Sequence, residues 1–205
     1  MSKHRIFIAI TVPENVRRRL MKEVEPWRDL PIRWAAPANI HATLLFIGNV
    51  DEDELARIAL MLPGAVEGVE IFDVTLHKIG IGPNARMPRM VWAEGETSQE
   101  LVELQKRIQE VVVGDRTVYD DDGFQDSDVE DRGLKAKKGM SGDKSFRLHV
   151  TLGRMIPFKW QKLDPKPDIG KDAHISFPIR SVELMESDLG PEGPAYTILQ
   201  SIPFD

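Results

Sequence analysis

Apolar residues along the chain fall into short runs typical of strands and into stretches with helical spacing. Pro13 suits the first turn of a helix, and Pro63 with Gly64 is expected to end another. The pattern predicts helices at 13–23, 51–62 and 97–113. It predicts strands at 5–12, 40–48, 69–79, 89–94, 147–154, 174–186 and 195–202, with a Gly/Pro-rich loop at 80–88. Seven strands and three helices predict an α+β fold.

Short sequences recur at a nearly constant distance along the chain. His41-Ala-Thr-Leu is followed by His149-Val-Thr-Leu, 108 residues later, and 72–74 and 91–94 are echoed at 177–179 and 196–199. We interpret the repeats as an internal duplication within one domain, 1–205. The predicted architecture is bilobal with a pseudo-two-fold axis: two antiparallel sheets face a central cleft, and the helices lie outside.

The net charge of −6 is concentrated in one segment. Residues 115–133 contain eight acidic and two basic residues, whereas 134–147 contain five basic and one acidic, which leaves −4 for the rest. So many charged and small residues predict a mobile insertion at about 115–147. Without a long basic stripe, any contact with a nucleic acid should be local. Lys135, Lys137 and Lys138 either touch a nucleic-acid backbone or form a solvated charge run.

The composition narrows the class of protein. With no Cys there is no disulfide, thiolate nucleophile or Cys-bound metal. No apolar run approaches the roughly 20 residues of a membrane helix, and the first residues lack the pattern of a signal peptide. We therefore expect a soluble, cytoplasmic protein that acts as a monomer, with no membrane contact and no obligate protein partner.

The two His-x-Thr sequences carry the candidate chemistry. In a strand, residues two apart share a face, so His41 and Thr43 should oppose Ile40, Ala42, Leu44 and Phe46. His149 and Thr151 should likewise oppose Leu148, Val150 and Leu152. Imidazole titrates near neutral pH, so one histidine of a pair can accept a proton while the other donates one. Two imidazoles and two hydroxyls around one ligand suit phosphoryl transfer, with no metal or cofactor required.

With these motifs the chain resembles the two-histidine (2H) phosphoesterases, specifically the RNA 2′,3′-cyclic phosphodiesterases, also called 2′-5′ RNA ligases. The similarity runs nearly from end to end: RIFIAI at 5–10, NIHATLLFIG at 39–48, VTLHKIG at 74–80, VWAE at 91–94, LHVTLGR at 148–154 and the closing segment 182–204. Leu148, where many relatives have Pro, and the long 115–147 segment depart from the family pattern.

The resemblance implies metal-independent hydrolysis of an RNA 2′,3′-cyclic phosphate to a 2′-phosphomonoester, with 2′-5′ ligation as the reverse reaction. It also implies roles for residues. His41 matches the proton donor and His149 the proton acceptor. Thr43, Thr151 and Arg154 match the residues that bind the phosphate of the substrate.

Two other functions stay open at this point. One is a non-catalytic module that binds RNA or nucleotides, although such a module would be expected to have lost at least one His or Thr. The other is a phosphodiesterase acting on 2′-5′ oligonucleotides or small cyclic nucleotides.

Several further residues have a weaker claim on function. His77 is expected at the surface, and His4 and His174 in exposed or loop positions. Phe46 and Trp92 could stack on a terminal base, but Phe46 shares the face of Ile40 and is expected in the core. Trp34, shortly before the first motif, fits either role.

Overall fold

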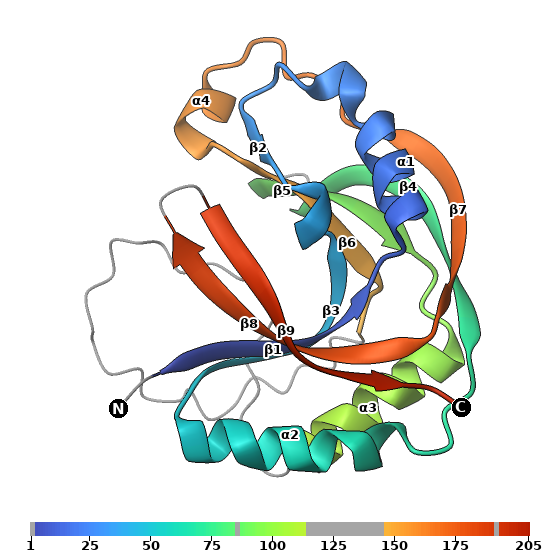
Figure 1. Cartoon of the computed structure of the whole chain (residues 1–205). Helices are drawn as coiled ribbons and strands as arrows, with labels where there is room; N and C mark the ends of the chain where they lie inside the picture. Colours follow the sequence, from blue (N-terminus) through green and yellow to red (C-terminus); the bar gives the residue numbers. More distant parts are fainter. Residues whose placement is uncertain (1–2, 85–86, 114–145, 191–192) are drawn as a thin grey trace.

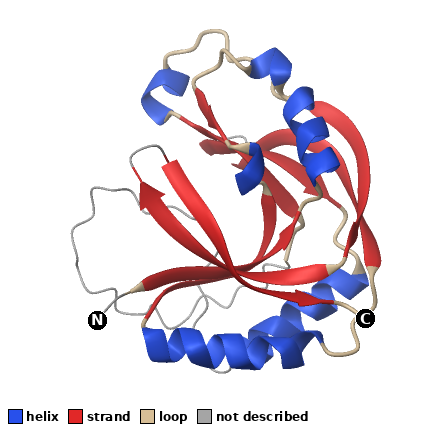
Figure 2. Cartoon of the chain, viewed as in Figure 1, coloured by secondary structure: helices blue, strands red, loops and turns tan. Residues whose placement is uncertain are grey.

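Nine strands and several short helices make up the described part of the chain, in a computed structural model that describes residues 3–84, 87–113, 146–190 and 193–205 (Figures 1 and 2). The predicted insertion falls almost wholly on 114–145, outside the described residues, and so do Lys135, Lys137 and Lys138. Those expectations stay predictions.

The elements follow one another as strands interrupted by helices. The strands are β1 (His4–Thr11), β2 (Ile32–Trp34), β3 (His41–Val50), β4 (Phe72–Asn84), β5 (Met87–Gly95), β6 (His149–Met155), β7 (Lys171–Ile179), β8 (Ser181–Gly190) and β9 (Gly193–Pro203). The helices are α1 (Glu14–Glu23), α2 (Glu52–Val66), α3 (Gln99–Val113) and α4 (Pro157–Gln161), with 3-10 turns η1 (Glu25–Trp27) and η2 (Pro37–Asn39).

The strands form two antiparallel sheets, as predicted for the α+β class. The four-stranded sheet has the order β3-β1-β8-β9, and the five-stranded sheet has the order β2-β6-β5-β4-β7. Each sheet therefore takes strands from both halves of the chain, so neither of the two sheets corresponds to one of the two repeats. The echoed segments 72–74 and 177–179 are neighbours in one sheet, with Asp73 paired to Pro178.

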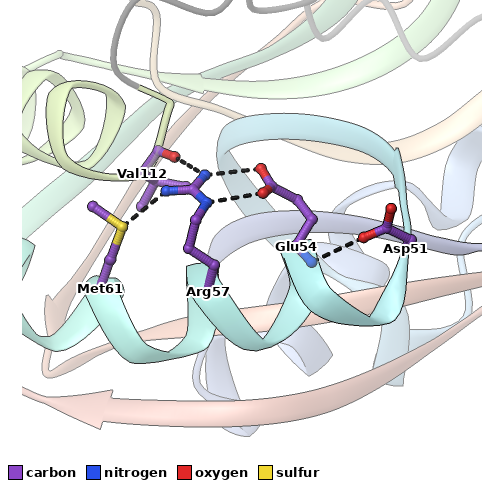
Figure 3. Close-up of polar contacts among 5 residues, drawn as sticks. All are labelled: Asp51, Glu54, Arg57, Met61 and Val112. Atoms are coloured by element: carbon purple, nitrogen blue, oxygen red, sulfur yellow. Dashed lines mark hydrogen bonds and ion pairs between the residues drawn. The ribbon is translucent and has the colours of Figure 1, made fainter.

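Helices α2 and α3 lie together against the four-stranded sheet (Figure 1). Figure 3 shows the polar contacts that hold them: Asp51 caps α2 by accepting from the Glu54 amide, and Arg57 donates to the Glu54 carboxylate and to the Val112 carbonyl of α3. The predicted end of α2 at residue 62 is wrong. The helix continues through Pro63 because Leu62, Ala65 and Val66 bury its apolar face, which offsets the lost hydrogen bond.

A bulge in β3 changes which side chains face the core. Ala9 pairs with Thr43 but Ile8 pairs with Leu45, so Leu44 is an extra residue. Leu44 and Leu45 are both buried, and the alternation is inverted beyond them. Phe46 therefore leaves the Ile40 face and packs with Phe7, Ala9 and Met185 in a small second cluster. The prediction that Phe46 lies in the main core is wrong for this reason.

Two other predicted boundaries differ from the structure. Strands β4 and β5 extend through most of the predicted 80–88 loop, to Asn84 and from Met87. The predicted strand 174–186 is two strands in different sheets, β7 and β8, separated at Arg180. A signal for this break is present, because the apolar residues that pack in the main core stand at odd positions up to Ile179 and at even positions, Val182 and Leu184, after it. The short elements β2 and α4 have no periodic signal long enough to predict them.

Among the described helices, none is long and apolar enough to cross a membrane.

Candidate active site

The two His-x-Thr motifs lie on β3 and β6, which contact each other where the two sheets meet (Figure 1). On β3, His41 and Thr43 are half-buried while Ala42 and Leu44 are buried in the core. On β6, His149 and Thr151 are half-buried while Val150 and Leu152 are buried. The predicted alternation of polar and core faces is therefore present in both motifs.

Both imidazoles are held in the same way by the backbone. His41 Nδ1 lies 2.7 Å from the carbonyl oxygen of Asn39, and His149 Nδ1 lies 2.9 Å from that of Arg147. A carbonyl oxygen only accepts hydrogen bonds, so Nδ1 of each ring carries the proton and donates it. In its neutral form each histidine then has its lone pair on Nε2. The geometry leaves Nε2 as the atom of each ring that can exchange a proton with a ligand.

His41 is enclosed by aromatic rings. The ring of Phe7 is 5.0 Å away, tilted by 34°, and the ring of Tyr196 is 5.0 Å away at 86°, edge to face. Burial lowers the pKa of His41 to about 4; the backbone bond to Asn39 opposes this shift, and the charges of His149 and Arg154 add to it. His149 and Arg154 therefore lie close enough to act on His41 electrostatically.

The depressed pKa of His41 predicts a stability that depends on pH. Between the unfolded value of 6.5 and the folded value of about 4, the unfolded chain binds the proton more tightly, so the free energy of unfolding falls as pH falls. We expect His41 to contribute about 2 kcal/mol of this loss between pH 7 and pH 4.5. Urea unfolding of the wild type and of His41→Asn at both pH values measures it. Equal losses in the two proteins would contradict the prediction.

His149 lies against an indole ring. Trp92, on β5, stacks on the imidazole with ring centroids 4.1 Å apart and planes 30° from parallel. Trp92 is buried and is the cross-strand partner of Thr151, so it is part of the site and not available to stack on a base. Gly82 on β4 makes room for the indole: a Cβ at Gly82 would lie 2.3 Å from Trp92 Cδ2 and Cε3. Trp92 is a candidate from the sequence, whereas no sequence pattern marks Gly82.

The structure places the other candidates as follows. Arg154 is exposed on β6, three residues after Thr151. His77 is half-buried, with Nε2 3.7 Å from Glu96, and His174 is exposed, as expected, but on a strand. His4 is half-buried on β1, with Nδ1 2.7 Å from Glu186 Oε1, which corrects the exposed position predicted for it. Trp34 is half-buried and donates its indole N–H to the Arg28 carbonyl.

Each of the two antiparallel sheets presents a His-x-Thr strand where the sheets meet, which is the arrangement expected from the resemblance to the two-histidine phosphoesterases. A family model described as LigT-like phosphoesterase matches residues 10–92. A Thermotoga maritima protein named RNA 2′,3′-cyclic phosphodiesterase is 28% identical over 205 residues, covering 98% of this chain and 96% of that protein. A Thermus thermophilus protein of the same name is 29% identical, covering 96% and 88%.

Similarity in structure agrees with similarity in sequence. The crystal structure of the Thermus thermophilus protein TT0787 superposes with a TM-score of 0.72 at 26% identity, covering 98% of this chain and 97% of that one. Over nearly its whole length the chain is therefore similar, in sequence and in structure, to LigT-like phosphoesterases.

Proposed function

We propose that this protein hydrolyses the 2′,3′-cyclic phosphate at an RNA end to a 2′-phosphomonoester, with His41 and His149 as the acid–base pair. The observation that carries the proposal is the matched pair of Nδ1 bonds to Asn39 and Arg147, which directs the proton chemistry of both rings to Nε2. The relatives named RNA 2′,3′-cyclic phosphodiesterase support the substrate class.

Each group has one task in the proposed step. His149 Nε2 takes a proton from water as the water oxygen attacks phosphorus. The bond from phosphorus to the 3′-oxygen breaks, and that oxygen takes a proton from His41 Nε2. Arg154 and the hydroxyls of Thr43 and Thr151 bind the non-bridging oxygens, where negative charge increases in the transition state. The imidazoles supply both the acid and the base, so the proposed step needs no metal ion or cofactor.

The low pKa of His41 adds a condition to this step. The free protein holds His41 neutral at pH 7, whereas a proton donor must be charged. A bound phosphate anion favours the imidazolium and offsets the positive charge of Arg154, which opposes protonation of His41 in the free protein. His41 therefore takes up its proton as the substrate binds.

The same groups serve 2′-5′ ligation. When an RNA 5′-hydroxyl replaces water as the attacking group, the product is a 2′-5′ phosphodiester, and no nucleotide triphosphate is consumed. The expectations of a monomer and of a cytoplasmic location stay predictions.

The test uses a short RNA ending in a 2′,3′-cyclic phosphate, with EDTA and no nucleotide. We expect the end to become a 2′-phosphate, identified by its resistance to a 3′-specific phosphatase and by mass. A 3′-phosphate product, a requirement for metal, or no turnover at all would overturn the proposal.

A further inference from the structure

Two arginines stand side by side at the edge of the five-stranded sheet. Arg33 on β2 and Arg154 on β6 are direct cross-strand partners, and both side chains are exposed. The neighbouring pair, Ile32 and Met155, is buried in the core, so the two arginines lie on the opposite face. Like charges directly opposite one another destabilise a sheet, with Cβ atoms only about 5 Å apart. The pair therefore lowers the stability of the fold. An anion bound between or above the two guanidinium groups would offset this repulsion.

Carboxylates of the described residues do not neutralise this pair. In that part of the chain, no ion pair or side-chain hydrogen bond joins Arg33 or Arg154 to a carboxylate, and the other cross-strand partner of Arg154 is the uncharged Met90. Four other arginines of the described residues do form ion pairs with carboxylates: Arg18 with Glu14, Arg28 with Glu25, Arg57 with Glu54 and Arg147 with Glu94. Two adjacent guanidinium groups thus form a local anion site in a chain whose net charge is −6.

The Arg33–Arg154 pair lies beside the candidate active site, on the side toward the edge of the sheet. Thr151 and Arg154 face away from the core on the same strand, and Arg154 acts electrostatically on His41. Arg33 lies one strand further out, on β2, the last strand of the sheet on that side. An RNA whose 3′ end occupies the site between the histidines extends only in its 5′ direction, and each further nucleotide adds one phosphate anion.

We propose that Arg33, beside Arg154, binds the phosphate on the 5′ side of the terminal nucleotide, forming a second phosphate subsite next to the cyclic phosphate. The planar guanidinium suits two parallel hydrogen bonds to the oxygens of one phosphate. This inference rests on the proposed function, because it takes the cyclic end of the RNA as the ligand between the histidines.

The test compares a nucleoside 2′,3′-cyclic phosphate with the same compound carrying a 5′-phosphate. In the wild type, we expect the 5′-phosphate to raise kcat/KM by about 5-fold, the effect of one solvent-exposed ionic contact. Arg33→Gln should abolish that gain and leave turnover of the compound without a 5′-phosphate unchanged. Arg180→Gln, which removes an exposed arginine from the turn between β7 and β8, should retain it.

Binding of the products separates the two proposals. Calorimetry gives Kd for a nucleoside 2′-phosphate with and without a 5′-phosphate, and it needs no turnover. Tighter binding that depends on Arg33, without turnover, would support the subsite while the proposed function fails. For a short cyclic-phosphate RNA, Arg33→Gln should also lower the magnitude of the salt slope by about 0.7. A 5′-phosphate effect that is absent in the wild type, or unchanged in Arg33→Gln, would overturn the subsite.

Discussion

Replacing either His41 or His149 with alanine is expected to lower kcat/KM on an RNA cyclic phosphate by about 10²–10⁴-fold, the usual contribution of a positioned acid or base. The loss of kcat/KM in the double variant should be much smaller than the product of the two single losses, because each histidine depends on the other within one step. Steady-state rates on a short cyclic-phosphate RNA measure both effects. Thr43→Ala and Thr151→Ala provide a comparison and should cost less. Near wild-type turnover by His41→Ala would contradict the assignment.

Substrates with different leaving groups distinguish the proton donor from the proton acceptor. A p-nitrophenyl phosphodiester releases an oxygen that needs no proton, so loss of the acid should matter little on it. His41→Ala should then lose much less on this substrate than on the cyclic phosphate, whereas His149→Ala should lose heavily on both. The opposite result would exchange the donor and the acceptor. The low pKa of His41 makes this test important, because a neutral imidazole is itself a competent base.

Gly82→Ala is expected to reduce both stability and turnover, although Gly82 belongs to neither His-x-Thr motif. Its new Cβ would lie 2.3 Å from the Trp92 ring, which is buried and stacked on His149 with centroids 4.1 Å apart. The indole must move, which costs about 1–3 kcal/mol of folding free energy. It must also shift His149, and a displacement of about 1 Å can cost 10²-fold in rate. Urea unfolding and kcat, measured where the variant is folded, test the two effects.

Gly64→Ala is the matched control for this prediction. Gly64 lies within α2, and a Cβ there meets nothing within 4 Å. Alanine is the better helix former, so this variant should gain up to about 1 kcal/mol and keep its activity. Adding Trp92→Phe to Gly82→Ala should recover part of the lost stability, because the smaller ring leaves room for the methyl group. If Gly82→Ala retains the full wild-type kcat, the position of His149 does not depend on the position of the Trp92 indole.

The sequence predicted the elements whose pattern is local and long. Helix α3 shows this well: helical spacing predicted it within 97–113, and its apolar residues Leu101, Leu104, Ile108 and Val112 are buried. Within the two motifs, at 40–44 and 148–152, polar and apolar residues also alternate between the two faces as expected. Where tertiary packing competed with a local signal, the prediction failed, as at Pro63, where the buried face of α2 extends the helix past its expected end.

The sequence by itself determined which residues could do the chemistry and on which face of a strand each would stand. His41 with Thr43, and His149 with Thr151, share a face because side chains alternate along any strand. Only the tertiary structure decided what surrounds them. The pairing of strands distant in sequence sets Trp92 on His149 and Arg33 beside Arg154, and the register of β4 against β5 places Gly82 against the indole. A one-residue bulge in β3 turned Phe46 to the His41 face. Such contacts depend on register and burial, which no local pattern encodes.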